Sequence, residues 1–445
     1  MVRLLAVTAA LATSLAASSS LIPPRLHRRF RIDEFLDQFE DKTESSGTDA
    51  VPDQWFESQL LDHNDPTNKA TWKQRYFVSD KFYGGPGSPV LLYIDGEWTA
   101  SNRTVVSTGL FLHELAKKHK AMVVSLEHRY YGESQPFPDF SSGNLKYLRA
   151  HQALADIVTF QDHFRATFNV TQASKWVAIG GSYPGMLAAW LKLKHPSRFA
   201  GIISSSGPIH TKADFFEYGD IVTHGLRYFG GDACVTTIQA AMTEAHRLLA
   251  SDTPVDAEIL KTLFNPCFDN THDDNRSVFE SQLFGAFQGI AQYNDFDADG
   301  STGLTKVCAA FADSNLSPIE KLSRFVGNRG GDNCTYNSFQ GYIDFYKNVT
   351  IDVDDPAARP WFYQTCSEFG FGQTTASGHG AFSPLKYATV DTVLYKLCAA
   401  VFDIHDVDAR TTATLNTYGG LKIDVENVVS TYTIHFGCLC MEITS

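Results

Sequence analysis

A single serine, Ser182, stands in the stretch whose residue types best suit covalent chemistry. Residues 176–179 form a short apolar run that is followed by Gly180 and Gly181, which is typical of a buried strand meeting a tight turn. Residues 186–193 are apolar with helical character. A serine between such a strand and such a helix is held in a strained turn with its hydroxyl exposed above the sheet edge. Ser182 is therefore our candidate for a catalytic nucleophile.

The glycine pattern around this serine is close to a known motif but not identical to it. The nucleophile elbow of α/β-hydrolases reads Gly-x-Ser-x-Gly, whereas this chain places Pro184 at the last position and Gly185 one residue later. We assign Pro184 to the first turn of the helix, where a missing N–H costs little. An ordinary glycine-rich loop is the alternative interpretation, and the elbow is the favoured one.

A serine hydroxyl needs partners before it can attack a carbonyl. A histidine must take its proton and a carboxylate must orient that histidine, and in α/β-hydrolases both follow the serine in the chain. The oxyanion is held by the backbone N–H after the serine, here that of Tyr183, and by an N–H from an earlier loop. Gly96 follows a predicted strand and is the candidate second donor, although a plain turn glycine fits it equally well.

The elements around this serine alternate between strand and helix. Buried strands are predicted at 90–94, at 122–126 and within 199–209, and helices at 108–119 and 148–168. Apolar strands that alternate with helices indicate an open, mostly parallel α/β sheet. We assign this part to residues 54–210.

The pattern changes near residue 210. Residues 211–400 are rich in helix-like segments and hold six of the eight cysteines, so we interpret them as a helical, disulfide-stapled cap inserted into the fold. Residues 401–445 return to the sheet, with a strand opening at Asn427 and a divergent tail from 430. The fold class that we predict is therefore an α/β-hydrolase with an inserted cap.

Composition indicates a folded globular protein. The chain has 445 residues, 43% of them hydrophobic and 20% charged, which is enough for a substantial core. Its net charge of −13 argues against a nucleic-acid partner, because such proteins need a basic face. We expect no membrane partner and no cofactor.

The N-terminus predicts export from the cytoplasm. Residues 1–17 combine a basic start with a short apolar run and small residues, which is typical of a secretory signal peptide, with a membrane anchor as the alternative. Residues 18–53 are polar and charged and look like a leader or linker. All eight cysteines lie at or after Cys234 without zinc-binding spacing, so disulfides are expected and a metal site is not.

Glycosylation sequons agree with the predicted export from the cytoplasm, and each sequon predicts a surface position for its asparagine. There are six of them: Asn102, Asn169, Asn275, Asn315, Asn333 and Asn348.

Several blocks in the same order resemble one family of serine peptidases. These blocks are GGSYPGMLAAW (180–190), LEHRYYGESQPF (126–137), LYIDGEW (92–98), LRAHQALAD (148–156), WFYQTCSEFGFGQT (361–374) and NTYGG (416–420). The family includes lysosomal Pro-X carboxypeptidase, dipeptidyl peptidase II and thymus-specific serine protease. The sequence of these blocks is most similar to the thymus-specific serine protease branch. The resemblance covers roughly residues 54–429.

This resemblance implies a secreted or lysosomal (vacuolar) peptidase with Ser182 as nucleophile, acting next to proline on short or terminal peptide segments. It assigns Glu97, Trp361, Tyr363 and Gln364 to the substrate pocket, with aromatic packing near a cysteine as the equal alternative for the 361–364 block. The family spacing implies three disulfides that staple the cap: Cys234 with Cys308, Cys267 with Cys334, and Cys366 with Cys398.

The resemblance also implies that Glu127, His128, Arg129 and Tyr130 form a buried polar network beneath the site. His128 is disfavoured as the base because it precedes the serine. The sequence leaves open whether the protein forms a homodimer.

The tail departs from the family. The family continues past this last strand to an Asn-Gly-x-x-Asp-Pro-Trp motif and a later His-Cys motif, and neither is found here. Asp424 and His435 have the right types and order, but their surroundings do not match. Cys438 and Cys440 have no place in the three disulfides that the resemblance implies. We therefore expect the 445-residue chain to be truncated or mis-spliced, and to have little activity and marginal stability.

Three functions follow from these residues. The first is a proline-directed serine peptidase that acts through an acyl-enzyme at Ser182. The second is a secreted, inactive peptidase that binds peptides without cutting them, which the missing motifs favour. The third is an esterase on the same fold, which the 126–137 block and the cysteine-rich cap disfavour.

Overall fold

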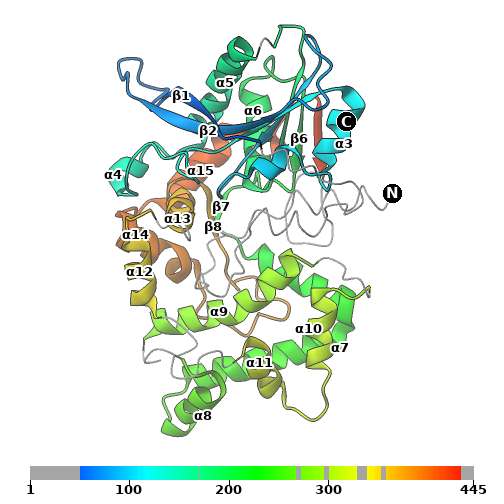
Figure 1. Cartoon of the computed structure of the whole chain (residues 1–445). Helices are drawn as coiled ribbons and strands as arrows, with labels where there is room; N and C mark the ends of the chain where they lie inside the picture. Colours follow the sequence, from blue (N-terminus) through cyan, green and yellow to red (C-terminus); the bar gives the residue numbers. More distant parts are fainter. Residues whose placement is uncertain are drawn as a thin grey trace.

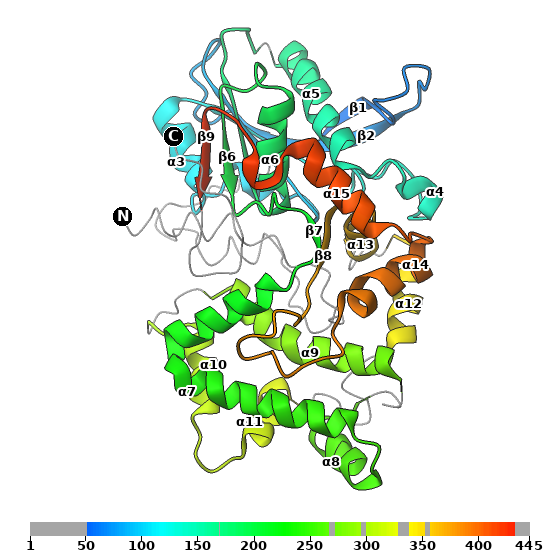
Figure 2. The ribbon, with the colours of Figure 1, turned by 180° about the vertical axis from the view of Figure 1, so that it is seen from behind.

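The computed structural model describes residues 51–168, 170–266, 272–294, 300–327, 338–351 and 357–431 (Figure 1). A sheet with flanking helices forms one end of the molecule, and helices α7 to α11 form a lobe at the other end (Figures 1 and 2). Between the two lie β7, β8 and the helices α12 to α15.

The main sheet has seven strands in the order β1-β2-β4-β3-β5-β6-β9. Strand β2 runs antiparallel to both of its neighbours, and β4, β3, β5, β6 and β9 run parallel to one another. The strands are β1 (Gln54–Leu60), β2 (Thr71–Ser79), β3 (Val90–Ile94), β4 (Met122–Leu126), β5 (Trp176–Gly181), β6 (Gly201–Ser205) and β9 (Val428–Thr431). The protein has the α/β-hydrolase fold, with Ser182 in the turn after β5.

The central strands are buried on both faces, which explains their continuous apolar sequence. Leu92 of β3 pairs in register with Ala178 of β5, and both belong to the core cluster shared with α5 and α6. The next pair, Tyr93 and Ile179, belongs to the separate cluster shared with α3. Successive residues thus serve opposite layers, as strand geometry requires.

Four helices cover this sheet and its edge: α3 (Phe111–His119), α5 (Ala150–Thr167), α6 (Tyr183–Lys194) and α15 (Val407–Tyr418). The Trp190 ring of α6 stacks on the Tyr418 ring of α15, with centroids 4.0 Å apart and planes at 10°. This stacking fixes the chain that returns from the lobe against the helix that follows Ser182. It also gives a packing reason for the tyrosine in the 416–420 block.

The rest of the chain between β6 and α15 is mostly helical. It contains α7 (Glu217–Ala250), α8 (Pro254–Phe264), α9 (Asp273–Gln292), α10 (Gly303–Phe311), α11 (Pro318–Val326), α12 (Phe339–Lys347), α13 (Ala358–Gln364) and α14 (Lys396–Phe402). A π-helical segment, Thr365–Phe369, continues α13, and a second one, Asp391–Tyr395, precedes α14. Strands β7 (Lys212–Asp214) and β8 (Gly370–Gly372) pair in parallel as the chain enters and leaves this region. The domain boundaries at 210/211 and 400/401 stay predictions.

Two disulfides lie within this region. Cys234 of α7 bonds to Cys308 of α10, and Cys366 of the π-helical segment bonds to Cys398 of α14. These are two of the three pairs that the family resemblance implies. The third, Cys267 with Cys334, lies outside the described residues.

Three short helical turns complete the fold: Asn102–Val105, Ser142–Leu145 and Gly420–Lys422. Within the described ranges, no helix combines the length and the apolar character that crossing a bilayer requires.

Candidate active site

Ser182 has an unusual backbone conformation. Its φ is 61° and its ψ is −127°, a region that residues with a side chain rarely adopt. Such a conformation costs on the order of 1–3 kcal/mol and persists only where the surroundings enforce it. Here the Ser182 N–H donates to the Ser205 carbonyl over 2.8 Å, which ties the turn to the neighbouring strand β6.

Glycines allow this sharp turn because the backbones approach too closely for side chains. A Cβ on Gly180 would lie 2.1 Å from the Pro184 carbonyl oxygen. A Cβ on Gly185 would lie 2.8 Å from the Ser205 carbonyl oxygen, and one on Gly207 would lie 2.8 Å from the Gly185 carbonyl carbon. The helix α6 can therefore fold back directly beside β5 and β6.

Pro184 occupies the first turn of α6, as we predicted from the sequence. A Cβ on Gly96 would lie 2.6 Å from Pro184 Cγ, so the residue-96 loop packs directly on the pyrrolidine ring. This contact places the loop against the elbow, where an oxyanion donor is needed. The roles of Gly96 and Tyr183 as oxyanion donors stay predictions.

The Tyr183 side chain is the centre of a buried hydrogen-bond network. Gln364 Nε2 donates to the Tyr183 hydroxyl over 2.9 Å, and His128 Nε2 lies 2.9 Å from the same oxygen. Tyr131 donates to Gln364 Oε1 over 2.5 Å. Because Gln364 uses its amide N–H, the Tyr183 hydroxyl is free to donate its proton to His128. Tyr183, the residue after Ser182, is thereby held by two polar side chains, and Tyr131 in turn holds one of them, Gln364.

His128 is not placed to act as the base for Ser182. Its Nδ1 lies 2.7 Å from the Arg129 carbonyl oxygen, so both ring nitrogens already have partners. Burial lowers the pKa of His128 to about 4, because the protonated ring would lose its hydration. A neutral ring with the proton on Nδ1 satisfies the carbonyl and the Tyr183 hydroxyl together.

The Ser182 hydroxyl is fully buried and has no hydrogen-bond partner among the described residues. Asp424 is exposed at the surface, and His435 lies outside the described residues. The Ser182 hydroxyl therefore forms a hydrogen bond with neither a histidine nor a carboxylate in the part of the chain that the structure describes.

Two of the three predicted pocket residues from α13 reach the elbow. The Trp361 ring lies 5.5 Å from the Tyr183 ring, and Gln364, three residues later on the same helix face, bonds to the Tyr183 hydroxyl. Tyr363 instead packs its ring against Phe402, in the cluster that contains the Cys366–Cys398 disulfide. Trp361 and Gln364 thus contact the residue that follows Ser182, whereas the Tyr363 ring packs on another aromatic ring; the pocket roles of all three stay predictions.

Glu97 is a buried carboxyl without a partner. It is 3% exposed, and neither of its oxygens bonds to another described residue. Burial raises the pKa of Glu97 well above its usual range, because the carboxylate would be desolvated.

Two members of the polar network that the resemblance implied, Glu127 and Arg129, each form a buried ion pair. Arg75 Nη2 lies 2.6 Å from Glu127 Oε1, and Arg129 Nε lies 2.6 Å from Asp156 Oδ2. The two partners Arg75 and Asp156 were missed by the sequence reasoning, because nothing local marks a residue as the counter-ion of a distant one.

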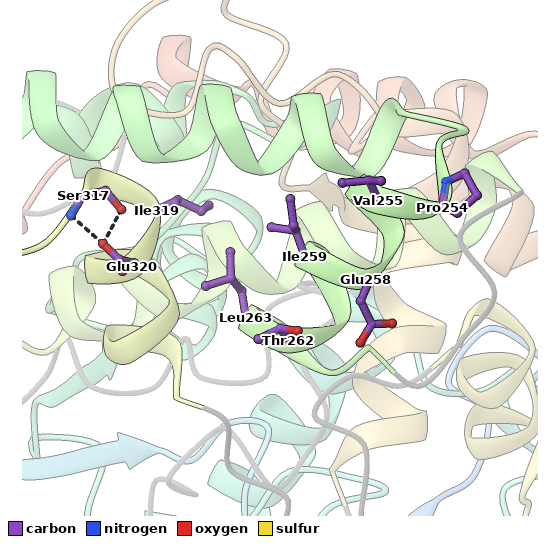
Figure 3. Close-up of a pocket in the computed structure, with 9 residues that line it drawn as sticks. All are labelled: Pro254, Val255, Glu258, Ile259, Thr262, Leu263, Ser317, Ile319 and Glu320. Atoms are coloured by element: carbon purple, nitrogen blue, oxygen red, sulfur yellow. Dashed lines mark hydrogen bonds between the residues drawn. The ribbon is translucent and has the colours of Figure 1, made fainter.

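A groove lies on the lobe, formed by elements other than those that hold Ser182. It has a volume of about 670 Å³, lies between α8 and α11 and is lined by Pro254, Val255, Glu258, Ile259, Thr262, Leu263, Ser317, Ile319 and Glu320 (Figure 3). At one end, the Ser317 backbone and hydroxyl both donate to the Glu320 carboxylate. Helices α8 and α11 lie at the end of the lobe away from the sheet (Figure 1).

The predicted glycosylation sites fall into three groups. Asn315 and Asn348 are exposed, and Asn102 and Asn275 are half-buried. Asn169 and Asn333 lie outside the described residues.

No group of three or more metal-ligating side chains occurs within the described ranges.

Comparisons with known proteins agree with this geometry. Residues 59–432 match the profile of the family described as Serine carboxypeptidase S28. The Caenorhabditis elegans protein K12H4.7, whose name describes a serine protease, is 33% identical over 383 residues, which are 82% of this chain and 73% of that protein. Mouse thymus-specific serine protease is 31% identical over 89% of this chain and 80% of its own length.

Human lysosomal Pro-X carboxypeptidase is 28% identical over 82% of this chain and 73% of its own length. The family match spans most of the chain and includes the strained serine, its glycines and the Tyr183 network. This chain belongs to the serine carboxypeptidase S28 family and is a hydrolase of the serine peptidase class.

Proposed function

We propose that this protein cleaves peptides next to proline through an acyl-enzyme at Ser182. The observation that carries the proposal is the strained backbone of Ser182, held between β5 and α6 by contacts that only glycines allow. The preference for proline rests on the similarity to a Pro-X carboxypeptidase. The substrate is a peptide, and the lobe beside the sheet would limit entry to short or terminal segments.

In this reaction the Ser182 oxygen attacks the carbonyl carbon of the scissile bond. The backbone N–H groups of Tyr183 and Gly96 hydrogen-bond to the oxyanion that forms. The serine proton passes to a base and then to the leaving amine, and water hydrolyses the ester in the second half of the cycle. Tyr183, fixed by Gln364 and His128, keeps its N–H in place for this step.

The proposed location is the secretory pathway, either outside the cell or in a lysosome-like compartment. Two disulfides and two exposed glycosylation sequons support an oxidising compartment. The similarity to a lysosomal relative points in the same direction. The homodimer also stays a proposal, which sedimentation of the purified chain would test.

Peptide binding without cleavage is the second candidate. It is favoured by the Ser182 hydroxyl, which has no partner for proton transfer among the described residues. In that case the same pocket would hold peptides, and no acyl-enzyme would form.

Labelling with a fluorophosphonate probe separates these functions. The 445-residue chain should label and should cleave proline-containing peptides only weakly, because the Asn-Gly-x-x-Asp-Pro-Trp and His-Cys motifs are not found in it, and Ser182→Ala should abolish both. Ser377→Ala, in a loop outside the site, is the matched control and should behave like the parent. Cleavage of p-nitrophenyl esters alone would indicate an esterase, and peptide binding without labelling would favour the second candidate. Labelling that survives Ser182→Ala would overturn the proposal.

A further inference from the structure

Three buried polar groups around Tyr183 have no hydrogen-bond partner among the described residues. They are the Ser182 hydroxyl, the Trp361 indole N–H and the Glu97 carboxyl, which belong to side chains no more than 3% exposed. Buried polar groups are normally satisfied, and several unsatisfied groups in one place indicate a missing ligand. Ser182 is the nucleophile of the proposed reaction. Of the other two groups, only the Glu97 carboxyl can carry a charge, so its burial is the more costly and needs an explanation.

Glu97 lies where the sheet meets the lobe. It follows Gly96, which packs on the Pro184 ring of the elbow. Its carboxyl interacts electrostatically with the phenols of Tyr131 and Tyr183 on the sheet side. It also interacts with the phenol of Tyr293, at the end of α9 in the lobe. The carboxyl therefore follows the loop that packs on the elbow and lies within electrostatic range of phenols from both parts of the molecule.

No cation among the described residues compensates Glu97, and this distinguishes it from the other buried glutamates. Glu127 is paired with Arg75, Glu280 with His246, and Glu368 lies 3.6 Å from Arg149. Neighbouring Asp95 also has donors, because it accepts hydrogen bonds from Ser125 and from the Trp98 indole. Burying an unpaired carboxyl is costly, so its retention suggests that a cation arrives with the ligand.

We propose that Glu97 recognises the α-ammonium group of the substrate, so that this site takes peptides with a free amino terminus. The inference rests on the proposed peptidase function. An ammonium carries three donors and a positive charge, which match a buried carboxylate that has no counter-ion among the described residues. A substrate carboxylate would meet no described cation here. With its amino terminus held beside Ser182, a peptide would lose only a short N-terminal unit.

The proposal predicts that a proton is released when a peptide binds. Burial raises the pKa of the Glu97 carboxyl, and Tyr93, Tyr131, Tyr183 and Tyr293 are the titratable groups that interact with it. Binding an ammonium favours the carboxylate, so the proton of Glu97 should be released when the peptide binds. Glu97→Gln keeps the shape of the side chain and cannot release that proton.

Calorimetry on the full chain carrying Ser182→Ala tests this without turnover. The ligands are one proline-containing tetrapeptide with free ends, its N-acetylated form and its C-amidated form. Acetylation should weaken binding about tenfold or more, and amidation should leave it unchanged. Titrations in two buffers with different ionisation enthalpies should show proton release with the free peptide.

Glu97→Gln should remove both the acetylation effect and the proton release. Glu258→Gln, an exposed carboxyl on α8, is the matched control and should change neither. Equal binding of all three peptides would overturn this inference and leave the peptidase proposal intact. Loss of binding on amidation would overturn it in favour of C-terminal recognition. If no peptide binds while the probe still labels Ser182, the inference and the peptide specificity both fail.

Discussion

Gln364 Nε2 donates a hydrogen bond to the Tyr183 hydroxyl over 2.9 Å, across 181 residues of sequence. Gln364 ends α13, in the part of the chain that returns from the lobe, whereas Tyr183 begins the helix after Ser182. The lobe side of the molecule is thereby connected to the residue whose N–H is our candidate oxyanion donor. We expect the loss of this hydrogen bond to lower both the stability of the protein and the reactivity of Ser182.

Tyr183→Phe should destabilise the protein by about 1–3 kcal/mol, because His128 Nε2 and Gln364 Nε2 would lose their buried partner. Urea unfolding measures this change, and the rate of probe labelling at Ser182 should fall as well. Tyr395→Phe is the control, since its hydroxyl bonds to Asp408 at the surface and its loss should cost under about 0.5 kcal/mol. Equal losses in the two variants would contradict the buried network.

Gly96→Ala should destabilise the protein by about 1–3 kcal/mol, because its Cβ would collide with the Pro184 ring. Pro184→Ala in the same chain should relieve part of that loss, leaving the part due to the Trp98 ring, which is equally close. A double-mutant cycle by urea unfolding measures the coupling. Gly143→Ala, whose Cβ would meet nothing within 4 Å, is the control. Strictly additive effects would show that the two residues do not touch.

Glu368→Gln should change how stability depends on pH. Burial raises the pKa of Glu368 to about 7 from 4.5, so between these values the native state holds a proton that the unfolded state has lost. The parent therefore loses stability as pH rises through this window, and the variant does not. The stability of Glu368→Gln relative to the parent should rise by about 3 kcal/mol from pH 4.5 to pH 7.

Urea unfolding at a series of pH values gives this difference directly. The amide oxygen that Glu368→Gln introduces can still accept the hydrogen bond from the Ala150 N–H, so the slope isolates the titration. The exposed Glu258→Gln variant should follow the parent in parallel. A relative stability that stays flat for Glu368→Gln would show that this carboxyl is already ionised at pH 4.5.

The two disulfides should differ in what their removal does to Ser182. Replacing either pair by alanines should cost about 2–5 kcal/mol, because the loops they close span 74 and 32 residues. Only the Cys366–Cys398 pair anchors the segment directly after Gln364, so its loss should also slow probe labelling. Loss of the Cys234–Cys308 pair, in the lobe, should leave the labelling rate unchanged. The reverse pattern would place the lobe disulfide in control of the site.

Much of the scaffold could be predicted because its signals are local. The strands at 90–94 and 122–126 have the predicted bounds, and the strand before Ser182 extends two residues further, through its glycines. Pro184 was placed correctly, since a proline after a turn fits only the first turn of a helix. These patterns depend on residues within one element, so no knowledge of the tertiary contacts was needed.

Short and irregular elements escaped prediction. Strand β1 has no clean alternation, and β7 and β8, with three residues each, exist only because they pair with each other across 158 residues. The π-helical segment after Gln364 also has no sequence signal, although it turns Cys366 towards Cys398. Pairing partners that lie far apart in the chain decide such elements.

The sequence by itself determined the candidate nucleophile, its glycine-rich turn and the family, because each depends on residue type and local spacing. Only the tertiary structure decided which polar groups surround that nucleophile. It placed Trp361 and Gln364 against Tyr183 but turned Tyr363 away, and it buried Glu97 without a described counter-ion. Burial and charge pairing depend on segments that meet only in the folded chain, so the reason for an unpaired carboxyl cannot be read from its neighbours in sequence.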